Sequence, residues 1–143
     1  MTSSPQTVLI VDDDVPLRTA FARALDRVGY DVIAVTGSRA VLDLIDTHDP
    51  AMMLLDNHMP DASGIELIRL VRERWSPAEL PIVLISGSSL QTEIDQAIEA
   101  GANDVRRKPV ELGELIATVH HALDRTASTD RASPGPATEG APT

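Results

Sequence analysis

The carboxylates best placed to do chemistry in this chain directly follow two short apolar runs. Asp12 and Asp13 come after residues 7–11, and Asp56 comes after residues 51–55. Two carboxylates 4 Å apart repel each other by roughly 4 kcal/mol at an effective dielectric near 20, so acids brought together need a proton or a cation. Oxygen ligands that leave room for water favour Mg²⁺. If the fold gathers these three acids, we expect them to hold a magnesium ion.

A single lysine is the second candidate for chemistry. Lys108 is the only lysine among 12 basic residues and stands directly before Pro109. Its ammonium is a compact, mobile charge, whereas arginine presents a flat fork. Three carboxylates, one Mg²⁺ and one ammonium sum to zero charge, so such a site could accept a phosphoryl group. One carboxylate could then be the nucleophile of aspartyl-phosphate chemistry, while the ammonium and the hydroxyl of Ser86 stabilise the transferring oxygens.

Apolar runs alternate with segments of helical periodicity along the chain. Strands are predicted at residues 7–11, 30–35, 51–55, 81–85 and 103–105, with a helix after each. Because strands buried on both faces appear as continuous apolar runs, we predict an α/β fold with a doubly wound five-stranded parallel sheet and helices on both faces. Ligand sites in such sheets lie at the carboxyl ends of the strands, where the candidate residues all stand.

Caps and spacing predict where the helices begin and what they bury. Asp14 is expected to cap the helix after the first strand, and Ser63 with Glu66 fits a capping box. A second helix is expected over residues 38–47. Apolar positions at helical spacing are expected to be buried in the third, fourth and fifth helices: Ile65, Ile68, Val71, Trp75, Ile94, Ala97, Ile98, Leu112, Leu115, Ile116, Val119 and Leu123.

The length of 143 residues predicts one domain. Residues 1–5 are expected to be a flexible N-terminus, residues 6–125 the folded domain, and residues 126–143 a disordered tail rich in Pro, Ala, Thr and Ser. A net charge of −10 argues against direct nucleic-acid binding. The chain has no cysteine, no apolar run of membrane-spanning length and no signal peptide, so a cytoplasmic protein without a membrane partner is expected.

Four motifs in this order resemble the receiver domain of two-component response regulators. They are Leu9-Ile10-Val11-Asp12-Asp13, Leu54-Leu55-Asp56-Asn57-His58-Met59-Pro60 with Gly64 beyond it, Val83-Leu84-Ile85-Ser86-Gly87, and Gly101-Ala102-Asn103-Asp104-Val105 leading into Lys108-Pro109. The likeness extends over residues 6–125. It implies a flavodoxin-like, receiver-type fold, and the chain is expected to be a stand-alone receiver.

The resemblance implies a role for each of these residues. Asp56 is the implied phosphoacceptor, and the donor is a phosphohistidine of a sensor histidine kinase or histidine phosphotransfer protein. The implied ligands of Mg²⁺ are Asp12, Asp13, Asp56 and the backbone carbonyl of His58, while Ser86 supplies the switch hydroxyl and Lys108 pairs with the phosphoryl group. The Lys108–Pro109 peptide bond is expected to be cis.

The segment around Val105 departs from the family pattern. Many receivers have a Tyr or Phe at this position that rotates inward on activation, and valine has no ring to rotate. We therefore expect the switch, formed by Ser86, Val105 and Pro109, to depend on Ser86 and the loop after it. The family's binding face for a downstream protein corresponds to about residues 91–125. The chain is not expected to be an enzyme beyond assisting its own phosphorylation and dephosphorylation.

Two alternative functions stay open. An interaction module that keeps the fold but works without phosphorylation is favoured by Val105 and disfavoured by the intact acids and Lys108. A Mg²⁺-dependent aspartyl-phosphate phosphatase is the second alternative. It is disfavoured because Asp56 is followed by Asn57 and His58, with no second acid two residues on to act as general acid and base.

Overall fold

Strands and helices alternate throughout the part of the chain that the structure describes. The computed structural model describes residues 6–59, 61–87 and 90–132, with residues 125–132 described by their backbone alone. The strands are β1 (Thr7–Val11), β2 (Asp31–Val35), β3 (Met52–Asp56), β4 (Ile82–Ser86) and β5 (Asp104–Arg107). The helices are α1 (Val15–Arg27), α2 (Val41–His48), α3 (Gly64–Arg72), α4 (Gln91–Ala100) and α5 (Leu112–Ala132). The predicted α/β class is confirmed.

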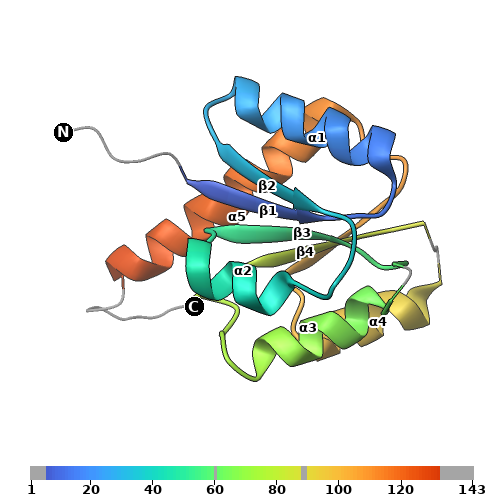
Figure 1. The fold of residues 1–143 in the computed structure, drawn as a ribbon. Coiled ribbons are helices and arrows are strands. Elements are labelled where there is room, and N and C mark those ends of the chain that lie inside the picture. Colours follow the sequence, from blue (N-terminus) through green and yellow to red (C-terminus); the bar gives the residue numbers. More distant parts are fainter. Residues whose placement is uncertain (1–5, 60, 88–89, 133–143) are drawn as a thin grey trace.

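The strands form one parallel sheet in the order β2-β1-β3-β4-β5. Figure 1 shows β2, β1, β3 and β4 in this order. Every residue of β3 and β4 is buried, whereas the edge strands β2 and β5 are partly exposed. After β2 the chain crosses back over β1 to place β3 on its other side. This reversal brings the carboxyl ends of β1 and β3 together, and in open α/β sheets the ligand crevice lies at such a point.

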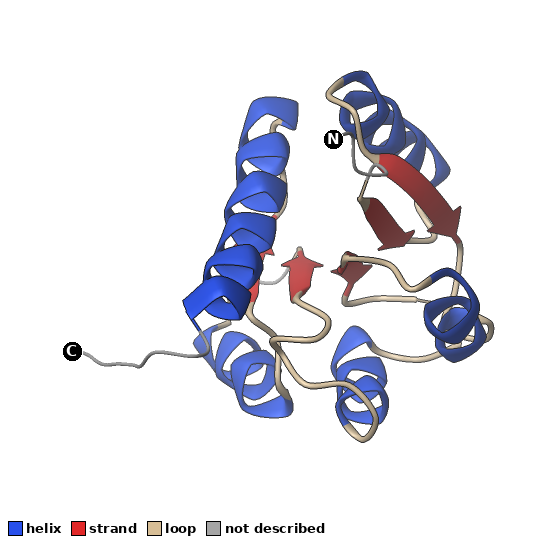
Figure 2. Ribbon diagram, turned by 90° about the vertical axis from the view of Figure 1, so that its left-hand side faces the viewer, coloured by secondary structure: helices blue, strands red, loops and turns tan. Residues whose placement is uncertain are grey.

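Helices cover both faces of the sheet (Figure 2). Leu9 and Leu55 face the cluster that includes buried residues of α2, α3 and α4, while Ile10 and Leu54 face the cluster that includes α1 and α5. Successive strand residues therefore point to opposite cores, which is why the central strands are continuously apolar in sequence. None of the described helices is long and apolar enough to cross a membrane.

The predicted caps of α1 and α3 are confirmed. The carboxylate of Asp14 accepts a hydrogen bond from the backbone N–H of Leu17 at 3.1 Å. The Ser63 hydroxyl accepts from the backbone N–H of Glu66 at 3.1 Å, and the Glu66 carboxylate accepts in return from the Ser63 N–H at 3.1 Å. Both caps lie in the loops at the carboxyl ends of β1 and β3. They therefore fix the residues at which α1 and α3 begin.

Helix α2 begins at Val41, so the predicted start at Ser38 was wrong. The carboxylate of Asp61 accepts hydrogen bonds from the backbone N–H of Ser38 at 3.1 Å and from its hydroxyl at 3.0 Å. Those bonds join the β2–α2 loop to the β3–α3 loop and satisfy the Ser38 donors outside a helix. The two hydrogen bonds to Ser38 also hold the pKa of Asp61 below its ordinary value.

Two positions predicted to be core lie on the surface. Ile98 is 49% exposed and Leu112 is 45% exposed. Ala97 is the buried residue of α4, and the next residue on a helix points about 100° away from it, so Ile98 turns from the sheet. Leu112 opens α5 one turn before its first buried residue, Leu115. Trp75 lies beyond the end of α3 and is half-buried against the core.

Helix α5 continues to Ala132, past residue 125 where the sequence predicted the folded domain to end. Residues 126–132 include neither Gly nor Pro, the strongest helix breakers, and the first proline after them is Pro134. The rest of the predicted tail, residues 133–143, and the predicted flexible residues 1–5 lie outside the described residues.

Arg72 joins three segments at the opposite end of the sheet, a role that the sequence did not indicate. Its guanidinium donates hydrogen bonds to the carbonyls of Gly101 and Leu80 and to the Asn103 side chain, each at 2.9 Å. Burial lowers the pKa of Arg72 to about 10. Gly101 has φ +121°, and a Cβ there would lie 2.6 Å from Arg72 Cγ, so this position needs glycine for both reasons.

Candidate functional site

Three carboxylates meet at the carboxyl ends of β1 and β3. One side-chain oxygen each from Asp12, Asp13 and Asp56 lies within 4.8 Å of the other two. Asp12 is 3% exposed and Asp56 is 4% exposed, whereas Asp13 is open to solvent. The predicted gathering of these acids is therefore confirmed. Three oxygen donors at this spacing, one of them solvent-facing, suit a hard divalent cation that keeps bound water.

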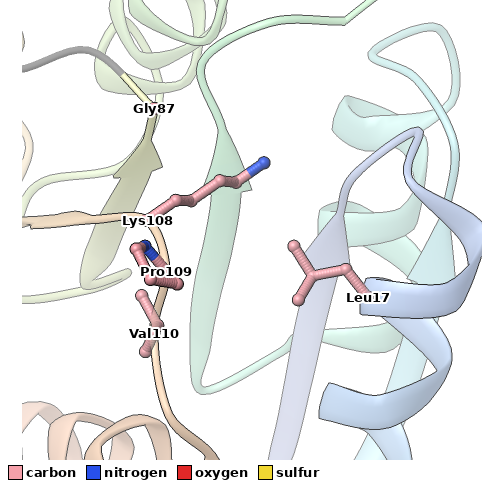
Figure 3. Close-up of a pocket in the computed structure, with 5 residues that line it drawn as sticks. All are labelled: Leu17, Gly87, Lys108, Pro109 and Val110. Atoms are coloured by element: carbon pink, nitrogen blue, oxygen red, sulfur yellow. The ribbon is translucent and has the colours of Figure 1, made fainter.

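Lys108 reaches into the same cluster from the end of β5. Its Nζ lies 3.2 Å from Asp56 Oδ1 and 4.0 Å from Asp12 Oδ2. The Lys108 backbone N–H donates to the Ser86 carbonyl at 2.8 Å, which fixes the base of the side chain to the end of β4. The following peptide bond to Pro109 is cis, as predicted. Figure 3 shows the side chain extending from the strand end with its ammonium pointing away from Pro109.

Burial makes the negative charge of Asp12 costly. Loss of hydration is the largest influence and raises the pKa of Asp12 above its ordinary value, and the nearby charge of Asp56 raises it further. The backbone N–H of Asp14, 2.9 Å from Asp12 Oδ1, and the ammonium of Lys108 both lower it, but do not reverse the net shift. The cluster therefore favours taking up positive charge, which is the property expected of a cation site.

Gly64 allows the α3 helix to begin directly against the backbone of Asp56. Its N–H donates to the Asn57 carbonyl at 2.8 Å. A Cβ at position 64 would lie 2.8 Å from the Asp56 carbonyl oxygen and 2.9 Å from Asn57 Cα, closer than real Cβ contacts. Glycine is therefore required by the close approach of two backbones. That approach fixes the position of the Asp56 backbone at the edge of the sheet.

Comparison with known proteins agrees with this geometry. Residues 8–120 match the family model of the response regulator receiver domain. The chain belongs to this family. It is 33% identical over 129 residues to the phosphate regulon transcriptional regulatory protein PhoB of Pseudomonas aeruginosa, which covers 90% of this chain and 56% of PhoB. It is 37% identical over 128 residues to the KDP operon transcriptional regulatory protein KdpE of Escherichia coli, covering 89% of this chain and 55% of KdpE.

A solved receiver gives the same fold. The crystal structure of a CheY-like response regulator receiver domain protein from Methanospirillum hungatei superposes with a TM-score of 0.81 at 25% identity, covering 87% of this chain and 98% of that protein. The present chain spans about half the length of the curated relatives it matches, 56% of PhoB and 55% of KdpE. The receiver assignment and the flavodoxin-like fold are thus confirmed.

The other residues predicted for the receiver site lie at the end of β4, in β5 or in the loops after β3 and β5. Ser86 is buried at the end of β4, next to β3, where Asp56 pairs in register with Ile85. His58 has an exposed side chain and pairs with Ser63 across the loop after β3. Val105 is half-buried against the core under α2, α3 and α4, and the Pro109 side chain is exposed. The roles assigned to these residues stay predictions.

Arg18 also contacts the site, and the sequence analysis missed it. Its Nη1 donates to the backbone carbonyl of Asp12 at 2.9 Å. Arg18 lies in the first turns of α1, six residues after Asp12. The helix that follows β1 therefore places a positive charge beside the backbone of Asp12. A basic residue on the helix that follows an acidic strand end is a signal that could have found it.

A pocket of about 390 Å³ lies beside Lys108 in the receiver. Its walls are the α1 residue Leu17, the loop residue Gly87 and the residues that lead into α5, Lys108, Pro109 and Val110 (Figure 3). The lining is mainly apolar apart from the lysine. A ring with an apolar face could therefore reach the edge of the acidic cluster from this side.

Proposed function

We propose that this receiver takes a phosphoryl group on Asp56 from the phosphohistidine of a sensor histidine kinase or a histidine phosphotransfer protein, with Mg²⁺ as cofactor. The observation that supports this most is the cluster itself: three carboxylates within 4.8 Å of one another and a lysine ammonium 3.2 Å from Asp56 Oδ1. In the transfer, a carboxylate oxygen of Asp56 forms a bond to phosphorus while the phosphorus–nitrogen bond of the donor breaks. The leaving imidazole keeps the electron pair of that bond and takes up a proton.

Each side chain has a defined part in this proposal. Asp12, Asp13, Asp56 and the His58 backbone carbonyl would hold the cation, which when bound supplies positive charge to the phosphoryl oxygens. The Lys108 ammonium, already paired with Asp56, would then pair with an oxygen of the phosphoryl group. With the cation bound, positive charge would already surround Asp56 before the transfer, so only a small shift of Lys108 would be needed.

Ser86 and the pocket complete the proposed site. Ser86 would donate its hydroxyl to a phosphoryl oxygen and thereby draw the end of β4 toward Asp56. The apolar walls at Leu17 and Val110 would receive the flat imidazole of the donor beside Lys108. No further catalytic group is needed, so we propose that the protein is a switch that assists its own phosphorylation and dephosphorylation, and not an enzyme acting on other substrates.

The proposed output is a change in binding to a downstream protein. The segment 91–125, which includes α4, β5 and the first part of α5, exposes two large apolar side chains, Ile98 and Leu112. Isolated apolar side chains are normal on protein surfaces, so the assignment of this segment as the binding face rests on the resemblance to the family. Phosphorylation would alter this surface through the loop that joins Ser86 to α4.

The proposal is tested by incubating the protein with Mg²⁺ and acetyl phosphate and measuring the intact mass. The wild type should gain one acid-stable, base-labile phosphoryl group and Asp56→Ala none. Asp13→Ala should lose most of the labelling and its dependence on Mg²⁺. Absence of any label on the wild type would instead favour the phosphorylation-independent interaction module. Rapid turnover of varied phosphate esters would favour the phosphatase.

A further inference from the structure

Helix α4 is held against the domain by few apolar contacts. Ala97 is its one fully buried residue, whereas α3 buries five. The residue before α4 is Leu90, whose hydrocarbon side chain cannot cap the helix N-terminus. With so little burial, individual polar contacts have a large share in fixing where α4 lies.

One such contact joins α4 to the residue that follows the phosphoacceptor. Asn57 Nδ2 donates to Glu93 Oε1 at 2.9 Å, and Glu93 lies in the first turn of α4. Asn57 is 3% exposed. Its backbone is fixed on both sides, since its N–H donates to the Ile85 carbonyl at 3.2 Å and its carbonyl accepts from Gly64 at 2.8 Å. The hydrogen bond therefore connects a rigid part of the site to a weakly packed helix.

Glu93 also determines which way the Asn57 amide faces. Asn57 Oδ1 is buried, and no donor from the described residues reaches it. A buried acceptor without a partner destabilises the arrangement that contains it. Because a carboxylate accepts only from the Nδ2 end of the amide, Glu93 fixes this orientation. If Glu93 moves away, the amide is free to turn and satisfy its oxygen.

Two connections thus lead from the site to the start of α4. One is covalent, from Ser86 through residues 87–90 to Gln91, the first residue of α4. The other is the Asn57–Glu93 hydrogen bond. If Ser86 moves toward a phosphoryl group, the covalent connection pulls on the start of α4. Asn57 does not follow, because its backbone is hydrogen-bonded to β4 and α3.

We propose that the Asn57–Glu93 hydrogen bond is a latch that holds α4 in its unphosphorylated position and opens when Asp56 is phosphorylated. This inference rests on the proposed function and adds its regulation: Val105 offers no aromatic ring, and the latch supplies the coupling to α4. Thermodynamic linkage then requires that a contact stabilising the unphosphorylated arrangement also opposes phosphorylation. Removing Glu93 should therefore free α4 and favour the phosphorylated form.

Hydrogen–deuterium exchange of peptides covering residues 91–100 tests the latch, with and without Mg²⁺ and acetyl phosphate. In unphosphorylated Glu93→Ala, we expect these amides to exchange about tenfold faster than in the wild type, the effect of one charge-assisted hydrogen bond. The wild type should reach a similar rate only after phosphorylation. Glu93→Gln, which keeps an acceptor, should be intermediate. Glu99→Ala, an exposed glutamate of the same helix, should behave like the wild type.

The intact mass of each sample separates the latch from the proposed function. At the same acetyl phosphate concentration, the fraction of Glu93→Ala labelled on Asp56 should be higher than that of the wild type. Two results would overturn the latch alone. One is that amide exchange in α4 of the wild type does not change when the protein is labelled. The other is that α4 of unphosphorylated Glu93→Ala exchanges at the wild-type rate. Wild type that takes up no phosphoryl group would overturn the proposed function, and the latch with it.

Discussion

Replacing Gly64 with alanine should disturb Asp56, the proposed phosphoacceptor, through its backbone. The new Cβ would lie 2.8 Å from the Asp56 carbonyl oxygen, 2.8 Å from Leu84 Cδ1 and 2.9 Å from Asn57 Cα. Leu84 can move its methyl group aside, but the two backbone positions belong to the end of a central strand. The helix must therefore move away from β3, or the end of β3 must shift together with Asp56.

The expected cost follows from two opposing contributions. Overpacking at a site that cannot relax costs about 1–3 kcal/mol of unfolding free energy. The alanine returns about 0.4–1 kcal/mol by restricting the unfolded chain. The net loss should be about 1–2 kcal/mol, which lowers the Tm by about 4–8 °C in a domain of this size. A shift of a few tenths of an ångström at Asp56 should also slow labelling by acetyl phosphate by about tenfold.

Gly113→Ala is the matched control for this variant. Gly113 also lies in the first turn of a helix, α5, but a Cβ there meets nothing within 4 Å. This variant should be more stable than the wild type by about 0.4–1 kcal/mol and be labelled at the wild-type rate. Urea unfolding and timed intact-mass measurements check both variants. Equal stability changes in the two proteins, or normal labelling of Gly64→Ala, would refute the argument from close packing.

Three further predictions concern single side chains. Lys108→Arg keeps the charge 3.2 Å from Asp56 but replaces the compact ammonium with a planar head, so labelling by acetyl phosphate should fall by roughly tenfold or more; an unchanged rate would contradict the role given to the lysine. Asp12→Asn should unfold at higher urea than the wild type at pH 7 without Mg²⁺. The pKa of Asp12 is raised in the folded state above its ordinary value of 3.8, so the extra stability of the variant should shrink as the pH falls through the raised pKa toward 3.8. The same extra stability at all pH values would argue against burial of the charge as its cause. Arg72→Met should cost about 2–4 kcal/mol of unfolding free energy because several carbonyls lose their donor. Arg69→Met, at an exposed position of the same helix, should change it by less than about 0.5 kcal/mol, and similar losses in the two variants would contradict the joining role of Arg72.

The position of the acidic site was predictable because two simple rules combine. Buried parallel strands have continuous apolar sequences, and all parallel strands of a sheet end at the same edge. Asp12 and Asp56 each follow such a strand directly, so their meeting needed no knowledge of any side-chain contact. The same reasoning placed Lys108 beside them from a weaker fifth strand.

Contacts between loops and helices far apart in sequence were not predictable in this way. Asn57 and Glu93 are 36 residues apart, and neither residue type nor spacing marks them as partners. Helical periodicity also failed at Ile98, because the spacing of Ile94, Ala97 and Ile98 marks an apolar face of α4 but not which part of that face turns toward the sheet. Those features depend on packing between elements, which local sequence does not encode.

The measurement that tests the central claim most directly is the identification of the modified carboxylate. After labelling with acetyl phosphate and Mg²⁺, borohydride reduces an acyl phosphate to an alcohol, so a phosphorylated aspartate becomes homoserine, which tandem mass spectrometry locates in the sequence. We predict homoserine at position 56 alone, with none at positions 12 and 13. Homoserine at position 12 or 13, or a labelled protein that forms none, would contradict the division of roles among the three acids.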